Sequence, residues 1–178
     1  MSGSKLKQDL VDYLQRYPEE RSQIEDFLEL VDGSGDCFSR SNWLPGHITG
    51  SCWLVDPTGE RLLLTHHRKL DIWVQLGGHS DGEVDTTRTA LREAEEESGL
   101  AVELLDTAIF DLDIHSIPAG KSDPEHYHFD VRHILRAKSS DFTVSPESID
   151  LAWVAMGDID TYTQEESILR MRRKWLNR

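Results

Sequence analysis

The sequence predicts an α+β domain with a mixed β-sheet. Apolar residues recur at helical spacing near both ends of the chain, whereas strand-like apolar runs fill the middle around one long helix. The strands and helices do not alternate regularly, which argues against a doubly wound parallel sheet. The 178 residues are 38% hydrophobic and 29% charged, a composition typical of one globular domain.

The N-terminal segment has two amphipathic repeats separated by Pro18, and these predict a helical hairpin. We expect residues 1–35 to form an N-terminal helical extension packed on the core, and residues 36–178 to form the main domain. A partner-binding or substrate-capping role is the alternative to simple packing. The apolar positions of the two repeats are Leu6, Leu10, Leu14 and Tyr17, followed by Ile24, Phe27, Leu28 and Val31.

Four to six strands are expected after the hairpin, and the same periodicity argument predicts two further helices. Ile168, Met171 and Trp175 define one face of the last helix, which we expect to cap the sheet. The strand-like runs cover residues 47–56, 61–67, 101–114, 127–137 and 151–156, and the helical patterns cover residues 86–98 and 164–176.

The charge balance disfavours polyanionic partners. The chain carries 19 Lys and Arg against 33 Asp and Glu, a formal net charge of −14, which repels nucleic-acid polymers and anionic membranes at long range. Cys37 and Cys52 show no CxxC spacing, and no signal-peptide core or run of roughly 18 apolar residues occurs. We therefore expect reduced thiols and a cytoplasmic location.

The most informative segment runs from Leu76 to Leu100, LGGHSDGEVDTTRTALREAEEESGL. A glycine-rich acidic loop leads into a helix, for which Asp85 is a plausible N-cap. Gly99 follows the helix at the position where a left-handed residue ends it.

Three carboxylates in this helix stand at i, i+3 and i+4 and therefore share one face: Glu93, Glu96 and Glu97. Like charges this close repel each other, so a sheltered cluster implies a bound cation. Hard oxygen ligands suit Mg²⁺ or Mn²⁺. The alternative is an ordinary solvated acidic helix face.

These residues resemble the box of the Nudix hydrolase superfamily, G-x5-E-x7-R-E-U-x-E-E-x-G-U with U apolar. REAEEESGL, starting at Arg92, matches the second half, and Gly77 and Gly78 begin the box. The box and the preceding LLLTHHRKLDIWVQ are similar to a bacterial branch of that superfamily. One position departs, because Val84 stands where the pattern has its first Glu. The family's first Glu pairs with the box Arg, a role that Glu83 or Asp81 could take here.

The resemblance implies a Nudix-like α/β/α sandwich that carries the helical hairpin as an addition. It further implies Mg²⁺- or Mn²⁺-dependent hydrolysis of a nucleoside diphosphate linked to another moiety, by attack of water on phosphorus. Glu93 and Glu97 would bind metal, Glu96 would complete the ligand set, and the carbonyl of Gly77 would add a backbone oxygen. Arg92 would orient the loop.

Glu147, just before the last strand, lies in a region where several Nudix enzymes place a catalytic acid. Either Glu147 or one of the box glutamates would deprotonate the attacking water. For Glu147, an ordinary solvated loop glutamate is the alternative.

Two polar clusters are candidates for substrate binding. His66, Arg68 and Lys69 follow an apolar strand and would meet phosphates, unless they form an ordinary basic surface loop. His79, in the box loop, is assigned to the same role.

The second cluster lies in EHYHFDVRHIL, where alternation puts His126, His128, Asp130 and Arg132 on one strand face. A solvent-facing side of an antiparallel sheet is the simpler interpretation. In the functional interpretation His126 and His128, with or without His115, line the substrate or an extra metal site.

Two other functions stay open. The domain could be a non-catalytic sensor of nucleotide sugars, although its intact glutamates argue against that role. It could also resemble the isopentenyl diphosphate isomerases, although the segment directly before His79, Leu76 to Gly78, lacks the Cys that this branch requires. The partner in every case is a small-molecule diphosphate, and a homodimer is possible on this acidic surface.

Overall fold

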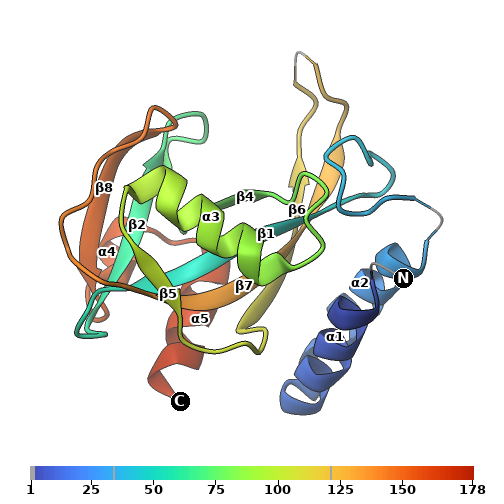
Figure 1. The fold of residues 1–178 in the computed structure, drawn as a ribbon, viewed down its shortest axis with the longest axis horizontal. Coiled ribbons are helices and arrows are strands. Elements are labelled where there is room, and N and C mark those ends of the chain that lie inside the picture. The colour runs from blue at the N-terminus through green and yellow to red at the C-terminus, as the bar shows by residue number, and fades with distance from the viewer. Residues whose placement is uncertain (1–2, 34, 121) are drawn as a thin grey trace.

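The computed structural model describes residues 3–33, 35–120 and 122–178 of the chain (Figure 1). Its helices and strands, in chain order, are α1 (Ser4–Arg16), the short 3₁₀ helix η1 (Pro18–Glu20), α2 (Arg21–Asp32), β1 (Gly46–Val55), β2 (Arg61–His67), β3 (Ile72–Val74), β4 (Gly77–His79), α3 (Thr86–Ser98), β5 (Val102–Leu104), β6 (Asp111–Ile117), β7 (His126–Ala137), β8 (Ser148–Ala155), α4 (Ile159–Tyr162) and α5 (Glu166–Leu176).

The strands form one mixed sheet, as the sequence predicts. Its main path runs β3-β2-β1-β7-β5, while β4 pairs with β1, β6 with β7 and β8 with β2. The long central strands β1 and β7 run parallel, in register from Gly46 opposite Tyr127 to Val55 opposite Arg136. The other pairings are antiparallel.

Alternation along the central strands divides the core into two layers. Cys52 and Leu54 point to the face that α3 covers, and their neighbours Trp53 and Val55 point to the opposite face, which α4 and α5 cover. Figure 1 shows α3 lying across the sheet, with α5 near the C-terminus on the other side. The fold is therefore the α/β/α sandwich expected from the sequence.

The N-terminal helices pack on the same sheet. Leu10, Tyr13 and Phe27 are fully buried, and their cluster includes Ile48 of β1 and Phe129 of β7. The ring of Phe27 meets that of Phe129 edge to face at 5.3 Å. These contacts attach the hairpin to the two central strands of the sheet.

A buried network of charges joins the hairpin to the C-terminal helix. Asp111 of β6 is fully buried and pairs with Arg132 at 3.2 Å, Arg170 at 2.7 Å and Lys174 at 2.7 Å. Lys174 also lies 2.6 Å from Glu20. Arg170 and Lys174 of α5 thus form ion pairs with the buried carboxylate of Asp111, and Lys174 links this carboxylate to the hairpin.

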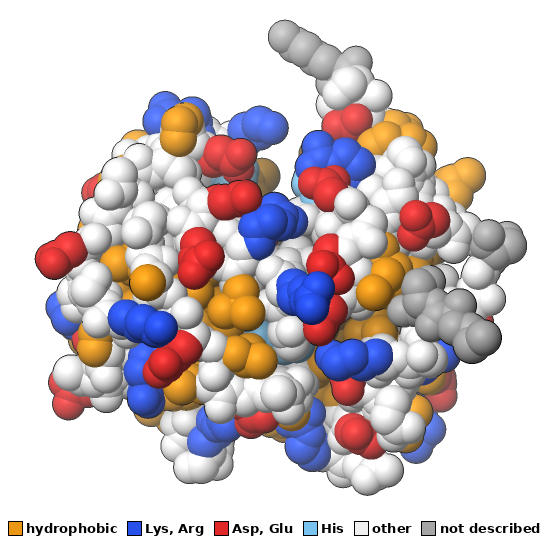
Figure 2. Space-filling view, viewed as in Figure 1, with side chains coloured by type: hydrophobic (Ala, Val, Ile, Leu, Met, Phe, Trp, Pro, Cys, Tyr) orange, Lys and Arg blue, Asp and Glu red, His pale blue; other side chains and the backbone are white. Residues whose placement is uncertain are grey.

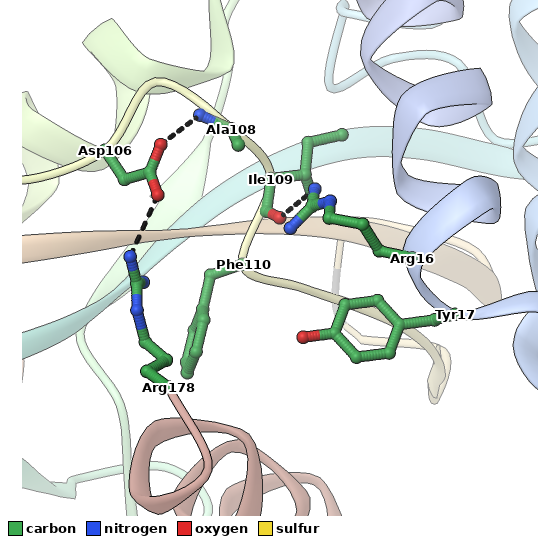
Figure 3. A pocket seen from close by; sticks show the side chains of 7 residues that line it. All are labelled: Arg16, Tyr17, Asp106, Ala108, Ile109, Phe110 and Arg178. Atoms are coloured by element: carbon green, nitrogen blue, oxygen red, sulfur yellow. Dashed lines mark hydrogen bonds and ion pairs between the residues drawn. The ribbon is translucent and has the colours of Figure 1, made fainter.

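A small pocket opens where the hairpin meets the main domain (Figure 3). Arg16 donates to the carbonyl of Ile109 at 2.8 Å, and Arg178 donates to Asp106 at 2.9 Å. These contacts hold α1, the segment before β6 and the C-terminus together, and the pocket contains none of the predicted site residues.

One strand prediction is wrong. Residues 101–114 form two strands, β5 and β6, which pair with β7 at Ala137 and at Arg132. The break contains Asp106, whose carboxylate accepts the N–H of Ala108 at 3.0 Å and so closes a turn. The sheet also has more strands than expected. The additional strands β3 and β4 are only three residues long, which is too short to show an alternating pattern in the sequence. Among the described residues, no helix has the length and apolar character needed to cross a membrane.

Candidate active site and metal centre

Helix α3 has the ends that the sequence predicts. The carboxylate of Asp85 accepts the N–H of Thr87 at 3.1 Å, and Gly99 ends the helix with a φ of 68°. These ends fix the helix between Thr86 and Ser98, and its acidic face then lies over β4.

The short strand β4 brings glycine backbone against that face. The N–H of Gly77 donates to Oε1 of Glu97 at 2.7 Å. A Cβ on Gly78 would lie 2.5 Å from Oε2 of Glu93. A side chain at this position would therefore displace the carboxylate of Glu93, whereas glycine permits this close approach of strand and carboxylate. The contact observed at Gly77 is made by its amide, and a role for its carbonyl toward metal stays a prediction.

Burial shapes the electrostatics of the two inner carboxylates. Glu97 is 7% exposed, and burial raises its pKa to about 8 despite the Gly77 N–H, with the charges of Glu93 and Glu147 adding to the effect. Burial also raises the pKa of Glu93, against the opposing effect of Arg92. Two such carboxylates form a site that favours either protons or a cation.

The guanidinium of Arg92 bridges the start of the loop and the acidic face. It donates to the carbonyl of His79 at 2.7 Å and lies 2.7 Å from Glu93 and 3.2 Å from Glu96. Glu96 is otherwise exposed, with 62% of its side chain accessible. The structure thus places Arg92 where it holds loop and glutamates together.

The stand-ins suggested for the missing box glutamate have other partners. Glu83 accepts the N–H of Asp85 at 2.9 Å and lies 3.8 Å from Arg88. Asp81 pairs with Arg40 at 2.6 Å. The expectation that one of them pairs with Arg92 is therefore not met, because Asp81 pairs with Arg40 and Glu83 lies closest to Arg88.

Glu147 lies in the exposed loop before β8, and its charge contributes to the raised pKa of Glu93 and Glu97. Arg68 holds this loop: its side chain donates to the carbonyls of Pro146 at 3.0 Å and Ser148 at 2.7 Å. The guanidinium of Arg68 thus holds the backbone on both sides of Glu147, and its contact with phosphate stays a prediction.

The other two predicted residues of the basic cluster, His66 and Lys69, form no hydrogen bond or ion pair with the described residues of the loop that carries Glu147. His66 bonds to Asp71 at 2.9 Å and stacks on Trp73 at 5.0 Å. Lys69 is exposed in the turn between β2 and β3. Figure 2 shows acidic and basic side chains interspersed on the face that carries α3, so this face has no single-sign patch.

The polar face of β7 is not solvent-facing, which corrects the simpler interpretation. His126 is 5%, Asp130 3% and Arg132 1% exposed. Asp130 accepts hydrogen bonds from Thr49 at 2.9 Å and from Ser51 at 2.6 Å, both on β1. Hydrogen bonds from the parallel partner strand therefore satisfy the buried carboxylate of Asp130.

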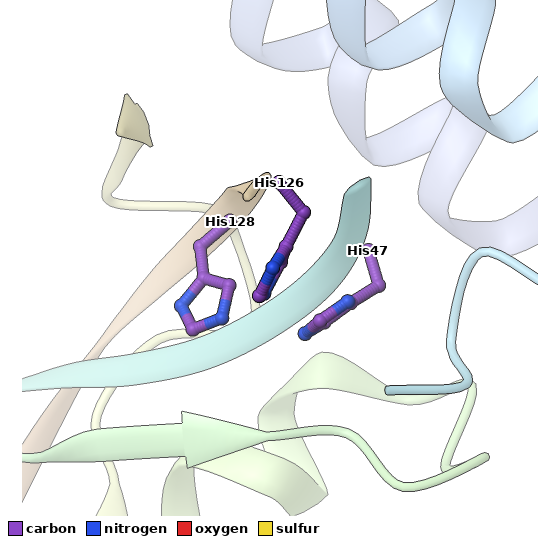
Figure 4. A group of neighbouring side chains, drawn as sticks. All are labelled: His47, His126 and His128. Atoms are coloured by element: carbon purple, nitrogen blue, oxygen red, sulfur yellow. The ribbon is translucent and has the colours of Figure 1, made fainter. Parts of the chain in front are cut away.

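The structure also adds a residue that the sequence reasoning missed. His47 at the start of β1 lies opposite His128, and its ring is 4.8 Å from that of His128 and 5.0 Å from that of His126 (Figure 4). The ring of His79 lies 5.2 Å from His47. No short-range pattern marked His47, because its neighbours come from a strand about 80 residues later.

The comparisons with known proteins agree on the family. The model of the NUDIX domain matches residues 46–175. A Nudix-family hydrolase of Clostridium perfringens is 25% identical with a TM-score of 0.56, over 72% of this chain and 95% of that one.

Two further solved structures share the fold. The Ap4A hydrolase of C. elegans is 15% identical with a TM-score of 0.53, over 73% of this chain and 95% of that one. The dihydroneopterin triphosphate pyrophosphohydrolase of E. coli is 12% identical with a TM-score of 0.52, over 74% of this chain and 96% of that one. No curated protein matches the chain. With the family model covering more than half of its length, the chain belongs to the Nudix family of hydrolases.

Proposed function

We propose that this Nudix hydrolase cleaves a diphosphate that links a nucleoside to another moiety, with Mg²⁺ or Mn²⁺ held by Glu93 and Glu97. One observation carries the proposal. The carboxylate of Glu97 is buried, yet among the described residues it pairs with no Lys, Arg or His and is held only by a backbone N–H. A buried carboxylate without a compensating charge is costly, and a divalent cation would compensate it.

The donor set fits a hard divalent ion. Glu93 and Glu97 offer carboxylate oxygens one helical turn apart, and Glu96 and the backbone of Gly77 lie beside them. Cys52 is buried near both glutamates, but burial raises its pKa well above the usual range, so the thiol is a poor ligand. When bound, the ion would neutralise charge on the pyrophosphate oxygens.

The chain's own residues position the glutamates and offer a group that can accept a proton from the attacking water. Arg92 fixes the β4–α3 loop through the carbonyl of His79 and so sets the distance between the glycine backbone and the glutamates. Glu147 is exposed and close enough to both buried glutamates to influence their pKa, a place suited to accepting a proton from the attacking water. Arg68 holds the backbone on both sides of Glu147.

The substrate class draws support from the relatives. Two of the structures that share the fold are named for Ap4A and for dihydroneopterin triphosphate, both of which contain phosphoric anhydride bonds. His66, Lys69 and His79 are the candidates for contacts to the groups attached to the diphosphate. Free, buried Cys37 and Cys52 fit a reducing compartment such as the cytoplasm.

The division of the chain is part of the same proposal. Residues 36–178 would carry the hydrolase site, and residues 1–35 would stabilise it from the side. The contacts of Phe27 with Phe129 support this division, since they attach the hairpin to β7 away from the glutamates.

The test is ³¹P NMR of the purified chain with Mg²⁺ and a panel of ADP-ribose, dinucleotides, nucleotide sugars, nucleoside triphosphates and isopentenyl diphosphate. We expect new monophosphate signals with one class, and a loss of turnover on the order of 10² or more in Glu97→Gln. Glu95→Gln is the matched control, because Glu95 lies on the same helix but is exposed.

Turnover of Glu97→Gln equal to that of the wild type would refute the site. Shifts that report binding without cleavage would support the sensor function instead, and conversion of isopentenyl diphosphate without phosphate release would support the isomerase.

A further inference from the structure

Three histidines from two neighbouring strands converge near one end of the sheet. His47 is the second residue of β1, His126 the first of β7, and His128 the register partner of His47. Each offers one ring nitrogen, and these three atoms lie within 4.8 Å of one another (Figure 4). The convergence is set by the parallel pairing of β1 and β7 and therefore by the fold itself.

Hydrogen bonds fix the tautomer of two of these rings. Nδ1 of His126 lies 2.7 Å from the carbonyl of Pro124, and Nδ1 of His47 lies 3.3 Å from the carbonyl of Asn42. A carbonyl only accepts, so both Nδ1 atoms carry the hydrogen and both Nε2 atoms present a lone pair. Metal-binding histidines are oriented in this way by their second nitrogen.

The three Nε2 atoms are buried and have no hydrogen-bond partner among the described residues. An unpaired buried polar atom is costly because it loses its hydrogen bonds to water, and here three such atoms occur together. Packing of the rings beneath Trp43, 4.9 Å from His126, accounts for the ring contacts but not for the unpaired nitrogens.

We propose that His47, His126 and His128 form a second metal site, which binds a divalent transition ion of the zinc class. Imidazole nitrogens suit Zn²⁺, Co²⁺ or Ni²⁺, whereas Mg²⁺ requires oxygen ligands. Three protein ligands leave a fourth position for water or a substrate oxygen. His79 borders the cluster at 5.0 Å from His128 and belongs to β4, the strand whose Gly77 contacts Glu97. The two metal sites thus flank one short strand.

The experiment titrates the tag-free, metal-stripped full chain with Co²⁺, followed by its visible absorption, and measures bound Zn²⁺ by mass spectrometry after dialysis. We expect about one equivalent of either ion, and an affinity at least tenfold weaker in His126→Gln and in His128→Gln. His128 is half-buried, whereas His126 is buried, so His128→Gln should disturb the fold less than His126→Gln. Thermal unfolding of each variant checks that it is folded.

Two controls separate this site from its surroundings and from the carboxylate site. His115→Gln removes a ring 5.4 Å from His128 that pairs with Asp113, and it should bind Co²⁺ like the wild type. Glu97→Gln should lose Mg²⁺ but keep Co²⁺, whatever becomes of the hydrolase activity. Co²⁺ and Zn²⁺ binding that is unchanged in a folded His128→Gln, or lost equally in His115→Gln, would overturn the proposal.

Discussion

At the scale of single residues, the candidate site depends on one carboxylate placed where it is poorly solvated. Among the described residues, the Gly77 N–H is the one hydrogen-bond donor that replaces the water Glu97 loses on folding. Its raised pKa is the sign of that loss. The same feature that weakens the metal-free protein would make the residue an effective cation ligand.

A pH dependence of stability follows from Glu97. Its folded-state pKa of about 8 lies above the ordinary value of 4.5, so the metal-free native state takes up a proton that the unfolded state releases. Stability should therefore fall as pH rises from 5 to 8. Urea unfolding in EDTA should show Glu97→Gln gaining on the order of 2 kcal/mol over wild type at pH 8, and little at pH 5. An equal difference at both pH values would contradict the burial of this charge.

A second residue-scale prediction concerns Gly78. Its substitution by Ala places a methyl group against the carboxylate of Glu93. Gly78→Ala should lower turnover at least tenfold, because a displacement of about 1 Å at a catalytic group costs up to 10²-fold. Gly157→Ala is the control, since nothing lies within 4 Å of the added atom. Steady-state rates that Gly78→Ala leaves intact would show that β4 does not position Glu93.

At the scale of elements, the candidate site lies where the acidic face of α3 meets the glycine backbone of β4. The sequence predicted α3 with both ends, because capping and periodicity are local signals within Asp85–Gly99. It did not predict β4, since Gly-Gly-His carries no alternation that marks a strand. The helical half of the site could therefore be read from sequence, whereas its strand half depends on pairing with β1.

The cap of α3 gives a prediction about this element. Asp85→Ala removes the acceptor for the Thr87 N–H and should cost about 1 kcal/mol of unfolding free energy. Asp85→Asn keeps a side-chain oxygen and should cost only a few tenths. Both variants lose the contact of Asp85 with Lys5, so the pair isolates the cap. Equal losses in urea titrations would assign the effect to the Lys5 contact instead.

At the scale of the whole molecule, buried charges join parts that are distant in sequence. Arg132, Arg170 and Lys174 surround Asp111, and Lys174 extends the network to the hairpin through Glu20. The sequence indicated only a polar strand face and a basic helix. It could not show that these groups face each other, because their pairing depends on long-range packing of β6, β7 and α5.

Because of this network, we expect substitutions of the adjacent residues Arg173 and Lys174 to lower the free energy of unfolding by different amounts. Lys174→Met leaves Glu20 without this cation and removes one of three from Asp111, and should cost about 2 kcal/mol. Arg173→Met removes an exposed pair with Glu166 and should cost at most about 0.5 kcal/mol. Hydrogen exchange should show faster opening of α1 and α2 in Lys174→Met alone. Unchanged protection of these helices would mean that apolar contacts suffice to hold the hairpin.

The most direct test of the account is hydrolysis in ¹⁸O-labelled water, with the phosphate products analysed by ³¹P NMR. We expect ¹⁸O on one phosphate product of a nucleoside diphosphate derivative, in the presence of Mg²⁺, for wild type and Glu95→Gln but not for Glu97→Gln. Products whose phosphates carry no ¹⁸O, or label that appears equally fast in Glu97→Gln, would contradict water attack on phosphorus at the α3–β4 site.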